Sequence, residues 1–308
     1  MPDKTDFNIL VDEIVTQNGF TDIRPVVEKE LLHYDILHCL AKNGLLKKLT
    51  FQGGTSLRLC YSSNRFSEDL DFAGGRDFCS ADLGRIKESV ENYLGARYGL
   101  EVTVKEPNEL RKEPEYANVK IDKWQISVTT APERKDLPKQ RIKIEIANIP
   151  AYTKNPRPLT RNYPVLPDGY SETIVLVEEL TEIMADKLVS FPATTKHIRY
   201  RDMWDLVWLK QQGVEPDTDL IKRKLSDYCL TDFGEQRLIQ ARLDSIENLI
   251  ASGTFQEEMK RFLPAPVYNR TIGQTDFMRY LETTLKALLT TVQKELYSPA
   301  TNPVPFKM

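Results

Sequence analysis

The 308-residue sequence has only four cysteines and three histidines, and it lacks any long apolar run. Cys39, Cys60, Cys79 and Cys229 are scattered without a Cys-x-x-Cys pair, so we expect reduced thiols and no zinc site. No apolar stretch is long enough to cross a bilayer, and the first residues, Met-Pro-Asp-Lys-Thr-Asp, are polar rather than signal-like. These absences predict a cytoplasmic protein without membrane contact.

A large excess of charge of one sign is also missing. The formal net charge is −3, which argues against a protein that coats nucleic acid by bulk electrostatic attraction. A local basic patch would still be enough for an RNA substrate, although each patch here can equally be an ordinary solvated face. The two patches contain Arg134, Lys135, Lys139, Arg141 and Lys143, and Lys196, His197, Arg199 and Arg201.

The length allows two domains, each with its own core, in a chain that is 41% hydrophobic and 28% charged. Apolar residues at helical spacing and strictly alternating segments are mixed in the first half of the chain. Helices are expected over residues 6–17, 26–40 and 81–98, and strands over 101–104, 118–130 and 141–149. The proline-rich segment 150–167 is expected to be a connector, because proline continues neither a helix nor a strand ladder.

Beyond residue 168 the pattern is mostly helical. The expected helices cover residues 177–189, 197–211, 217–228, 235–251, 256–262 and 276–295. With a boundary near Asp168-Gly169, the sequence predicts an α+β domain with a mixed α/β-type sheet over residues 1–168. A helical domain over residues 169–308 is expected to complete the ligand cleft and to select the substrate or partner.

The stretch from Phe51 to Phe72 carries the most specific pattern. Gly53 and Gly54 follow an apolar strand, where a backbone without Cβ atoms can turn sharply and approach a ligand. Thr55 and Ser56 come next, at the start of a short helix. Hydroxyls and amides in that position are suited to phosphate oxygens, so the turn is a candidate phosphate site.

Two acids end the same stretch, in an Asp-Leu-Asp-Phe segment. Because side chains alternate along a strand, Asp69 and Asp71 leave one face while Leu70 leaves the other. Two neighbouring carboxylates repel unless a cation lies between them, and hard oxygen ligands suit Mg²⁺. The sequence therefore predicts a phosphate cradle beside a magnesium site.

These features together resemble a known family. The pattern, Gly-Gly-Thr-x-Leu followed by Arg-Phe-Ser-Glu-Asp-Leu-Asp-Phe, is similar to that of the AbiEii/AbiGii-type nucleotidyltransferase toxins, within the polymerase-β-like nucleotidyltransferase superfamily. It is carried by Gly53, Gly54, Thr55, Leu57, Arg65, Phe66, Ser67, Glu68, Asp69, Leu70, Asp71 and Phe72. The resemblance implies a nucleotidyltransferase fold for the first domain.

A third acid is found on a regularly alternating strand. Ile142, Ile144 and Ile146 share one face, and Glu145 lies on the other with Lys143. The resemblance implies that an acid on a following strand completes the metal site, which makes Glu145 the expected third ligand. The alternative is an exposed acid paired with Lys143 or with a base on the neighbouring strand.

Two helical segments extend the resemblance to about residue 210. They run Glu-Glu-Leu-Thr-Glu-Ile-Met-Ala-Asp-Lys-Leu, ending at Leu188, and Arg-Tyr-Arg-Asp-Met-Trp-Asp-Leu, ending at Leu206. The resemblance implies that Lys187 contacts the triphosphate and that Asp202 holds or orients it. Ordinary intrahelical salt bridges are the alternative. Asp205 is expected to belong to the packing around the site, and the acidic partner of Lys187 is left open, because Asp186 precedes it where relatives carry an earlier glutamate.

The resemblance implies a toxin of a toxin–antitoxin or phage-defence system, with a cognate antitoxin as partner. Two Mg²⁺ ions at Asp69, Asp71 and Glu145 would promote transfer of a nucleotide from an NTP to an acceptor hydroxyl, first of all the 3′ end of tRNA. The expected catalytic residues are these three acids with Lys187 and Asp202. The expected nucleotide-binding residues are Gly53, Gly54, Thr55, Ser56, Arg65, Lys187 and Arg201.

Two other functions remain open. The acceptor could be a protein hydroxyl, on a partner or on the toxin itself. A nucleotide-binding regulator without turnover is the alternative from a different class, although such a module has no need of a third carboxylate. The sequence specifies neither the preferred base, nor the antitoxin, nor the oligomeric state.

Overall fold

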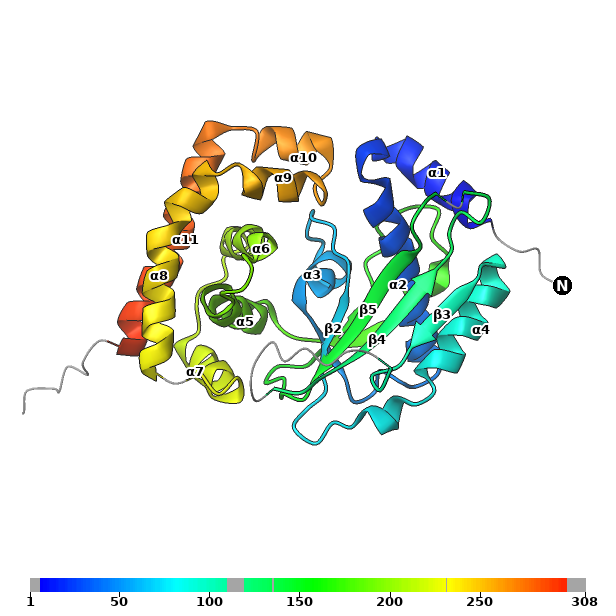
Figure 1. Cartoon of the computed structure of the whole chain (residues 1–308), viewed down its shortest axis with the longest axis horizontal. Helices are drawn as coiled ribbons and strands as arrows, with labels where there is room; N and C mark the ends of the chain where they lie inside the picture. The colour runs from blue at the N-terminus through cyan, green and yellow to red at the C-terminus, as the bar shows by residue number, and fades with distance from the viewer. Residues whose placement is uncertain (1–5, 110–118, 135, 231, 298–308) are drawn as a thin grey trace, which may run out of the picture.

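The computed structural model describes residues 6–109, 119–134, 136–230 and 232–297. A seven-stranded mixed sheet, in the order β3-β4-β5-β2-β1-β7-β6, lies on one side, and a group of helices, α5 to α11, lies on the other (Figure 1). The strands are β1 (Thr50–Gln52), β2 (Leu70–Ala73), β3 (Val102–Lys105), β4 (Ile121–Val128), β5 (Gln140–Ala147), β6 (Asn155–Pro158) and β7 (Ile174–Val177). The predicted mixed α/β fold is confirmed.

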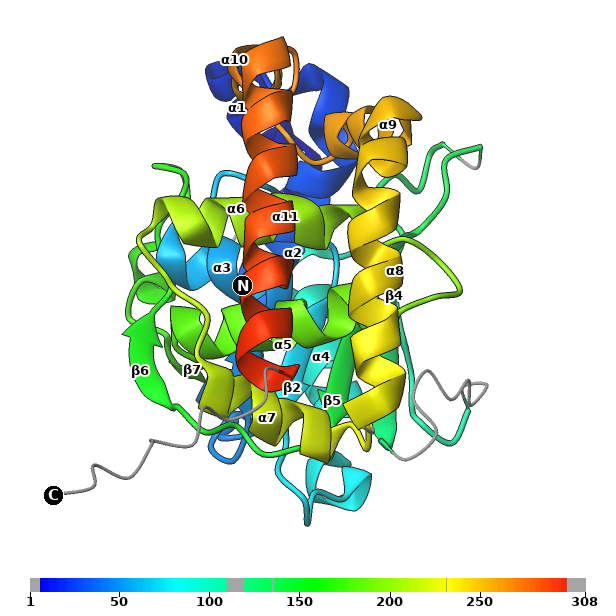
Figure 2. The ribbon, with the colours of Figure 1, turned by 90° about the vertical axis from the view of Figure 1, so that its left-hand side faces the viewer.

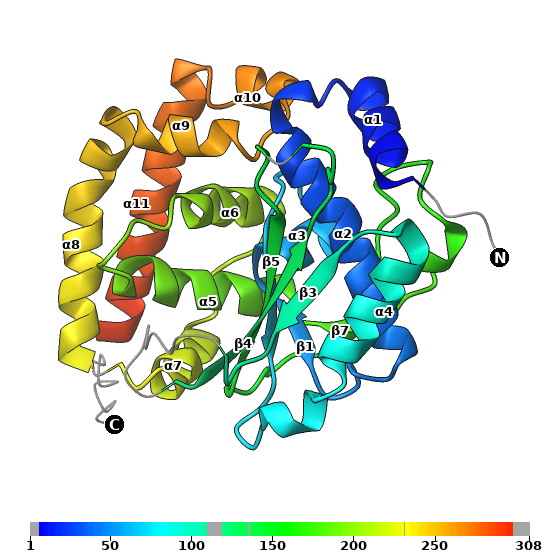
Figure 3. The same cartoon turned by 45° about the vertical axis from the view of Figure 1, so that its right-hand side comes forward.

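Four helices belong to the sheet half: α1 (Phe7–Asn18), α2 (Arg24–Lys42), α3 (Gly53–Tyr61) and α4 (Ile86–Tyr98). The Asp6 side chain caps α1 by accepting from the amides of Asn8 and Ile9, and Gly19 ends it in the left-handed region. The helix expected over residues 81–98 begins only at Ile86, after a separate 3₁₀ turn at Ser80–Leu83. Figure 3 shows α2 and α4 beside the sheet, away from the helical half.

The segment expected to be a connector contains a strand. β6 pairs with β7, and β7 pairs in parallel with β1 through Val177 and Phe51. Pro156 and Pro158 are tolerated because β6 is an edge strand, where a missing N–H removes no ladder hydrogen bond. The sheet thus extends to Val177, beyond the expected domain boundary near residue 168, and that boundary stays a prediction.

The helical half contains α5 (Leu180–Ala193), α6 (Tyr200–Gln211), α7 (Thr218–Asp227), α8 (Asp232–Ala251), α9 (Thr254–Lys260), α10 (Ala265–Arg270) and α11 (Thr275–Tyr297). Figure 2 shows the long helices α8 and α11 running along the outer side of α5 and α6. The short helix α10 was not predicted. No helix among the described residues is long and apolar enough to span a membrane.

Each half has its own apolar core, and each core takes one residue from the other half. Phe51, Phe72 and the isoleucines of β5 belong to the sheet-side cluster, which also includes Phe262 from the helical half. Leu57 of α3 belongs instead to the helical cluster. In addition, the Phe66 amide donates to the Phe262 carbonyl at 2.9 Å. The loop that leads into β2 is therefore fixed by residues from both halves.

Candidate functional site

The glycine turn between β1 and α3 brings the backbone close to charged side chains. Gly53 has φ +77°, and a Cβ there would lie 2.7 Å from Oδ2 of Asp71. A Cβ on Gly54 would lie 2.3 Å from Nη2 of Arg65 and 3.0 Å from Oγ of Ser67. Both positions therefore need glycine. The start of α3 borders a cavity of about 330 Å³, and a helix start of this kind favours anions.

The sheet wall of this cavity is acidic. Asp71 on β2 is opposite Gln52 of β1 and Glu145 of β5, and residues opposite one another in a sheet share a face. Asp69 lies just before β2, where its Oδ1 accepts from the Lys143 amide at 3.2 Å. The structure thus brings Asp69, Asp71 and Glu145 to one cavity, as expected, whereas their catalytic role stays a prediction.

The acids affect one another electrostatically. Burial, followed by the charges of Glu145 and Asp69, raises the pKa of Asp71 to about 7, although Arg199 and Lys187 act in the opposite direction. Glu145 also has a basic neighbour, because the Lys123 Nζ across the strand pair is 3.2 Å from its Oε1. The alternative interpretation of Glu145, an acid paired with a neighbouring base, is therefore present in the structure too.

The acidic wall fits a divalent cation only in part. Within the described ranges, no three carboxylate, imidazole or thiol groups converge on one point as a metal shell. Asp69 and Asp71 nevertheless supply the oxygen ligands that Mg²⁺ prefers, and the pKa of Asp71 is raised by burial and by the neighbouring carboxylates. Glu145 could bind the same cation only if its ion pair with Lys123 were broken.

The hydroxyls of Thr55 and Ser56 do not line the cavity. Both residues are buried, the Thr55 hydroxyl donates to the Asp69 carbonyl, and the Ser56 hydroxyl donates to the Gly53 carbonyl at 2.8 Å. The Thr55 hydroxyl thus connects the start of α3 to the segment before β2, and the Ser56 hydroxyl stabilises the glycine turn itself. Of the four expected phosphate-binding residues, the structure brings Gly53 and Gly54 to the cavity.

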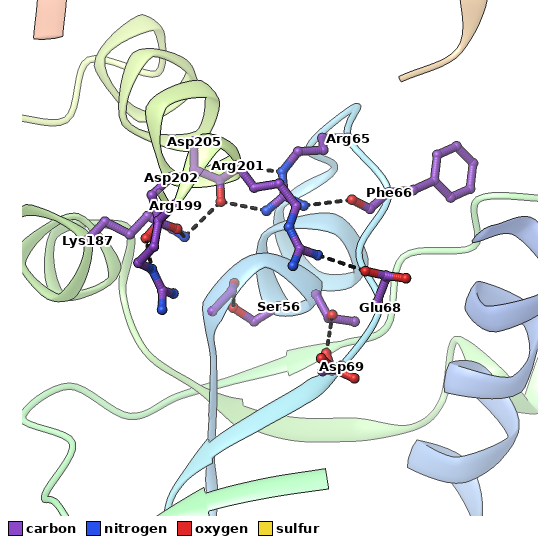
Figure 4. A network of polar contacts seen from close by, with 12 residues as sticks. Ser56, Arg65, Phe66, Glu68, Asp69, Lys187, Arg199, Arg201, Asp202 and Asp205 are labelled. Atoms are coloured by element: carbon purple, nitrogen blue, oxygen red, sulfur yellow. Dashed lines mark hydrogen bonds and ion pairs between the residues drawn. The ribbon is translucent and has the colours of Figure 1, made fainter. Parts of the chain in front are cut away.

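The helical wall carries buried cations held by two aspartates of α6. Lys187 of α5 is only 5% exposed, and its Nζ lies 2.8 Å from Oδ1 of Asp202 and 2.7 Å from Oδ2 of Asp205 (Figure 4). Burial by itself lowers the pKa of Lys187, but the two carboxylates outweigh it, so the pKa is raised. The ammonium therefore stays charged beside the cavity.

Asp202 connects several groups. Besides Lys187, it accepts from Nε of Arg199 and, at 3.3 Å, from Oγ of Ser190. Burial raises the pKa of Asp202, but Arg199 and Lys187 lower it more strongly, so the carboxylate stays ionised. Asp202 thus contacts Lys187, and it also forms a short-range ion pair with Arg199.

Asp205 is the residue whose importance the sequence interpretation missed. Its two carboxylate oxygens accept from Nε and Nη2 of Arg65 at 2.7 and 2.6 Å, and it also contacts Lys187. The signal was an aspartate between Trp204 and Leu206 in an apolar stretch, because a buried acid needs buried partners. Arg65 lines the cavity, but its guanidinium is occupied by Asp205 and by the Phe66 carbonyl.

Asp186, the other candidate partner of Lys187, belongs to a separate cluster. It lies 3.0 Å from Nζ of Lys224 on α7, and Glu178 and Glu182 lie 3.1 and 2.7 Å from the same atom. Lys224 is fully buried. Burial, followed by the charge of Asp186, raises the pKa of Glu178 well above its usual range. The cluster fastens α5 to α7, and the partners of Lys187 are Asp202 and Asp205.

The two predicted basic patches contribute unequally to the lining of the cavity. In the first, Arg134 pairs with Asp136 and Lys139 with Glu101, Lys143 lines the cavity, and Lys135 lies outside the described residues. In the second, three side chains reach the cavity. They are His197, Arg199 and Arg201.

Arg201 is held at the edge of the cavity. Its Nη1 donates to Oε2 of Glu68 at 3.3 Å, and its guanidinium lies 4.7 Å from the centre of the Phe262 ring. Carboxylates on the sheet wall thus face cations on the helical wall. Such a cavity suits an anionic ligand that brings its own cation, as a metal–triphosphate complex does.

Comparison with known proteins supports a nucleotidyltransferase. A family model described as nucleotidyl transferase AbiEii toxin, type IV toxin–antitoxin system, matches residues 35–283. A Helicobacter pylori protein provisionally described as a nucleotidyltransferase is 19% identical, with a TM-score of 0.49 over 88% of this chain and 96% of that chain. The H. pylori protein JHP933 is also 19% identical, with a TM-score of 0.47 over 88% and 93%. No curated protein matches the chain.

Proposed function

Because this chain belongs to the family of the nucleotidyl transferase AbiEii toxin of type IV toxin–antitoxin systems, we propose that it transfers a nucleotide from an NTP to an acceptor hydroxyl. The acceptor oxygen bonds to the α-phosphorus, the bond to the bridging oxygen breaks, and pyrophosphate leaves. The proton of the hydroxyl passes to the acidic wall. The observation that carries the proposal is that Asp69 and Asp71 line the same cavity as Lys187, together with the glycine turn.

Mg²⁺ dependence is part of the proposal. The cation, when bound, lowers the pKa of the acceptor hydroxyl and neutralises charge on the leaving pyrophosphate. Asp69 and Asp71 would hold it, with Glu145 joining them after it parts from Lys123. Burial and the carboxylates of Glu145 and Asp69 raise the pKa of Asp71, and a bound cation would offset both effects, which supports this assignment.

The protein residues bind and orient the phosphates. Lys187 supplies a compact positive charge, and Asp202 with Asp205 keeps it ionised and aimed at the cavity. The amides at the start of α3, exposed by Gly53 and Gly54, provide neutral donors for phosphate oxygens. Arg199 and Arg201 add positive charge at the opening.

We further propose the 3′ end of tRNA as acceptor and a cytoplasmic toxin, active in phage defence, that a cognate antitoxin neutralises. The family description supports the toxin and antitoxin roles. His197, Arg199 and Arg201, which border the cavity, supply a local basic surface for RNA although the net charge is −3.

The direct test uses each α-³²P-labelled NTP with Mg²⁺, with total tRNA present or absent. RNA and protein are resolved separately, and Asp69→Asn is run in parallel. We expect label on tRNA that disappears in Asp69→Asn. Label on protein would replace tRNA by a protein acceptor. NTP binding without any label would leave a nucleotide-binding regulator.

A further inference from the structure

A second, smaller cavity adjoins the first one. The two share Gly53, Asp71, Glu145, Lys187 and Arg199, so they form one continuous cleft. The second cavity has a volume of about 130 Å³. At ~30 Å³ for each water molecule this is room for about four waters, enough for one planar ring system but too little for a whole nucleotide.

The walls of the two cavities differ in character. The residues that line only the first cavity are mostly charged or polar and include Arg65, Lys143 and Arg201. The residues that line only the second are mostly apolar or aromatic: Gln52, Ile121, Ala147, Ile183, Asp186, Ser190 and Tyr228. Asp186 is already paired with Lys224. The second cavity therefore suits an uncharged, flat group better than a phosphate.

Two buried side-chain oxygens of the second cavity, Oε1 of Gln52 and Oδ1 of Asp186, have no hydrogen-bond partner within the described part of the chain. Gln52 is the last residue of β1 and is opposite Asp71, so the two side chains share a face. The Oε1 atom of Gln52 is buried and accepts no hydrogen bond within the described part of the chain. A buried polar atom without a partner is unfavourable, because it has given up its hydrogen bonds to water, which indicates that this amide has a partner when the cleft is filled.

The junction of the two cavities fixes how a nucleotide would lie. Asp71 and Lys187 line both, and they are the groups assigned above to the reacting phosphate. With the α-phosphate at this junction, the other phosphates extend into the charged cavity. The uncharged part of the nucleotide then extends into the apolar one.

We propose that the second cavity binds the nucleobase of the NTP and that the amide of Gln52 reads its hydrogen-bonding edge. A primary amide offers one donor and one acceptor side by side, which is the arrangement that pairs with base edges. Ile183 and Ala147 supply apolar walls for the ring. Gln52 is then a specificity residue, and the inference rests on the proposed nucleotide transfer.

The test measures binding rather than turnover. The full-length protein is titrated calorimetrically with Mg²⁺ and the α,β-methylene analogue of each of the four NTPs, and with inorganic tripolyphosphate. We expect at least one analogue to bind tenfold or more tighter than tripolyphosphate. Gln52→Met should remove most of that preference while leaving tripolyphosphate affinity within twofold of the wild type, which also shows that the variant is folded.

Two further variants sharpen the result. Ala147→Leu fills the second cavity and should weaken the analogues but not tripolyphosphate. Gln211→Met, at an exposed glutamine of α6, should bind every ligand as the wild type does. Equal affinity for analogues and tripolyphosphate, or an unchanged preference in Gln52→Met, would overturn the base pocket. Absence of binding by every ligand would instead overturn the proposed function.

Discussion

Asp205 accepts hydrogen bonds from both Nε and Nη2 of Arg65, although the two residues are 140 positions apart in the chain. Arg65 comes from the sheet half, in the loop before β2, and Asp205 from α6 in the helical half. Because Asp205 also contacts Lys187, one carboxylate holds the two walls of the cavity together. This position makes Arg65 a structural link, and the phosphate contact expected of it stays a prediction.

Asp205→Asn should destabilise the protein by about 3 kcal/mol or more, because two buried cations would lose a charged partner. The free energy of unfolding in urea measures this. Asp244→Asn, at an exposed residue of α8, should stay within about 0.5 kcal/mol of the wild type. Equal stability of both variants would show that the Arg65–Asp205 pair does not join the halves.

Asp71→Asn should abolish nucleotide transfer and yet stabilise the metal-free protein. The folded-state pKa of Asp71 is raised to about 7, so its contribution to stability is lost as the pH rises from the unfolded value of 3.8 through 7. Asparagine removes the repulsion from Glu145 and Asp69. In EDTA at pH 8 the Tm of the variant should exceed that of the wild type by about 2 °C or more.

The same two proteins test the metal site without an activity assay. Mg²⁺ should raise the Tm of the wild type but not that of Asp71→Asn, since only the first binds the ion. Asp77→Asn, at an exposed aspartate after β2, is the matched control and should respond like the wild type. If Mg²⁺ also raises the Tm of Asp71→Asn, Asp71 does not belong to the metal site.

Lys187→Met should lower kcat/KM for transfer by at least 100-fold, because it removes the buried positive charge that faces the phosphates. Lys143→Met, at an exposed lysine on the same cavity, should have a far smaller effect. Steady-state kinetics with each labelled NTP compare the two. Comparable losses in both variants would contradict a special role for Lys187.

A buried acid behind the sheet predicts a pH dependence of stability. Asp35 on α2 accepts from Tyr98 and Tyr170 and lies 3.0 Å from Nε of Arg97. Burial raises its pKa from 3.8 to about 6 despite these partners. The folded protein therefore binds more protons than the unfolded chain between these values, and the stability that Asp35 contributes falls as the pH rises through 6.

Asp35→Asn cannot titrate at this position. Its stability relative to the wild type should therefore rise by about 2 kcal/mol between pH 4 and pH 7. Urea unfolding at both pH values measures the change. If the difference in unfolding free energy between the variant and the wild type is the same at pH 4 and pH 7, Asp35 is ionised over this whole range.

The regular elements could be predicted from the sequence because their signals are local. Helical spacing identified α1, α2 and most helices after residue 177, and strict alternation identified β5. β6 was missed because prolines normally exclude a strand, and only its position at the edge of the sheet permits them. β7 was missed because its four apolar residues, Ile174–Val177, are too few to show a period. The short helix α10 offered too few residues for a period to show.

The site could be predicted in its short-range parts. The glycine turn and the Asp69–Asp71 pair follow from backbone geometry within one stretch of sequence. The partners of Arg65 and Lys224 could not be predicted, because these contacts join segments far apart in the chain, and spacing along a helix does not reveal them. Asp205 was taken for packing because its apolar neighbours are visible in the sequence and Arg65 is not.

The hydrogen bond from Phe66 to the Phe262 carbonyl has a consequence for the order in which the protein is made. Phe262 also completes the sheet-side core, so the loop before β2 acquires its last support only after residue 262 has left the ribosome. A growing or truncated chain carries the aspartates long before it carries this support. Synthesis therefore finishes most of the chain before the loop that leads into β2 is fixed in place.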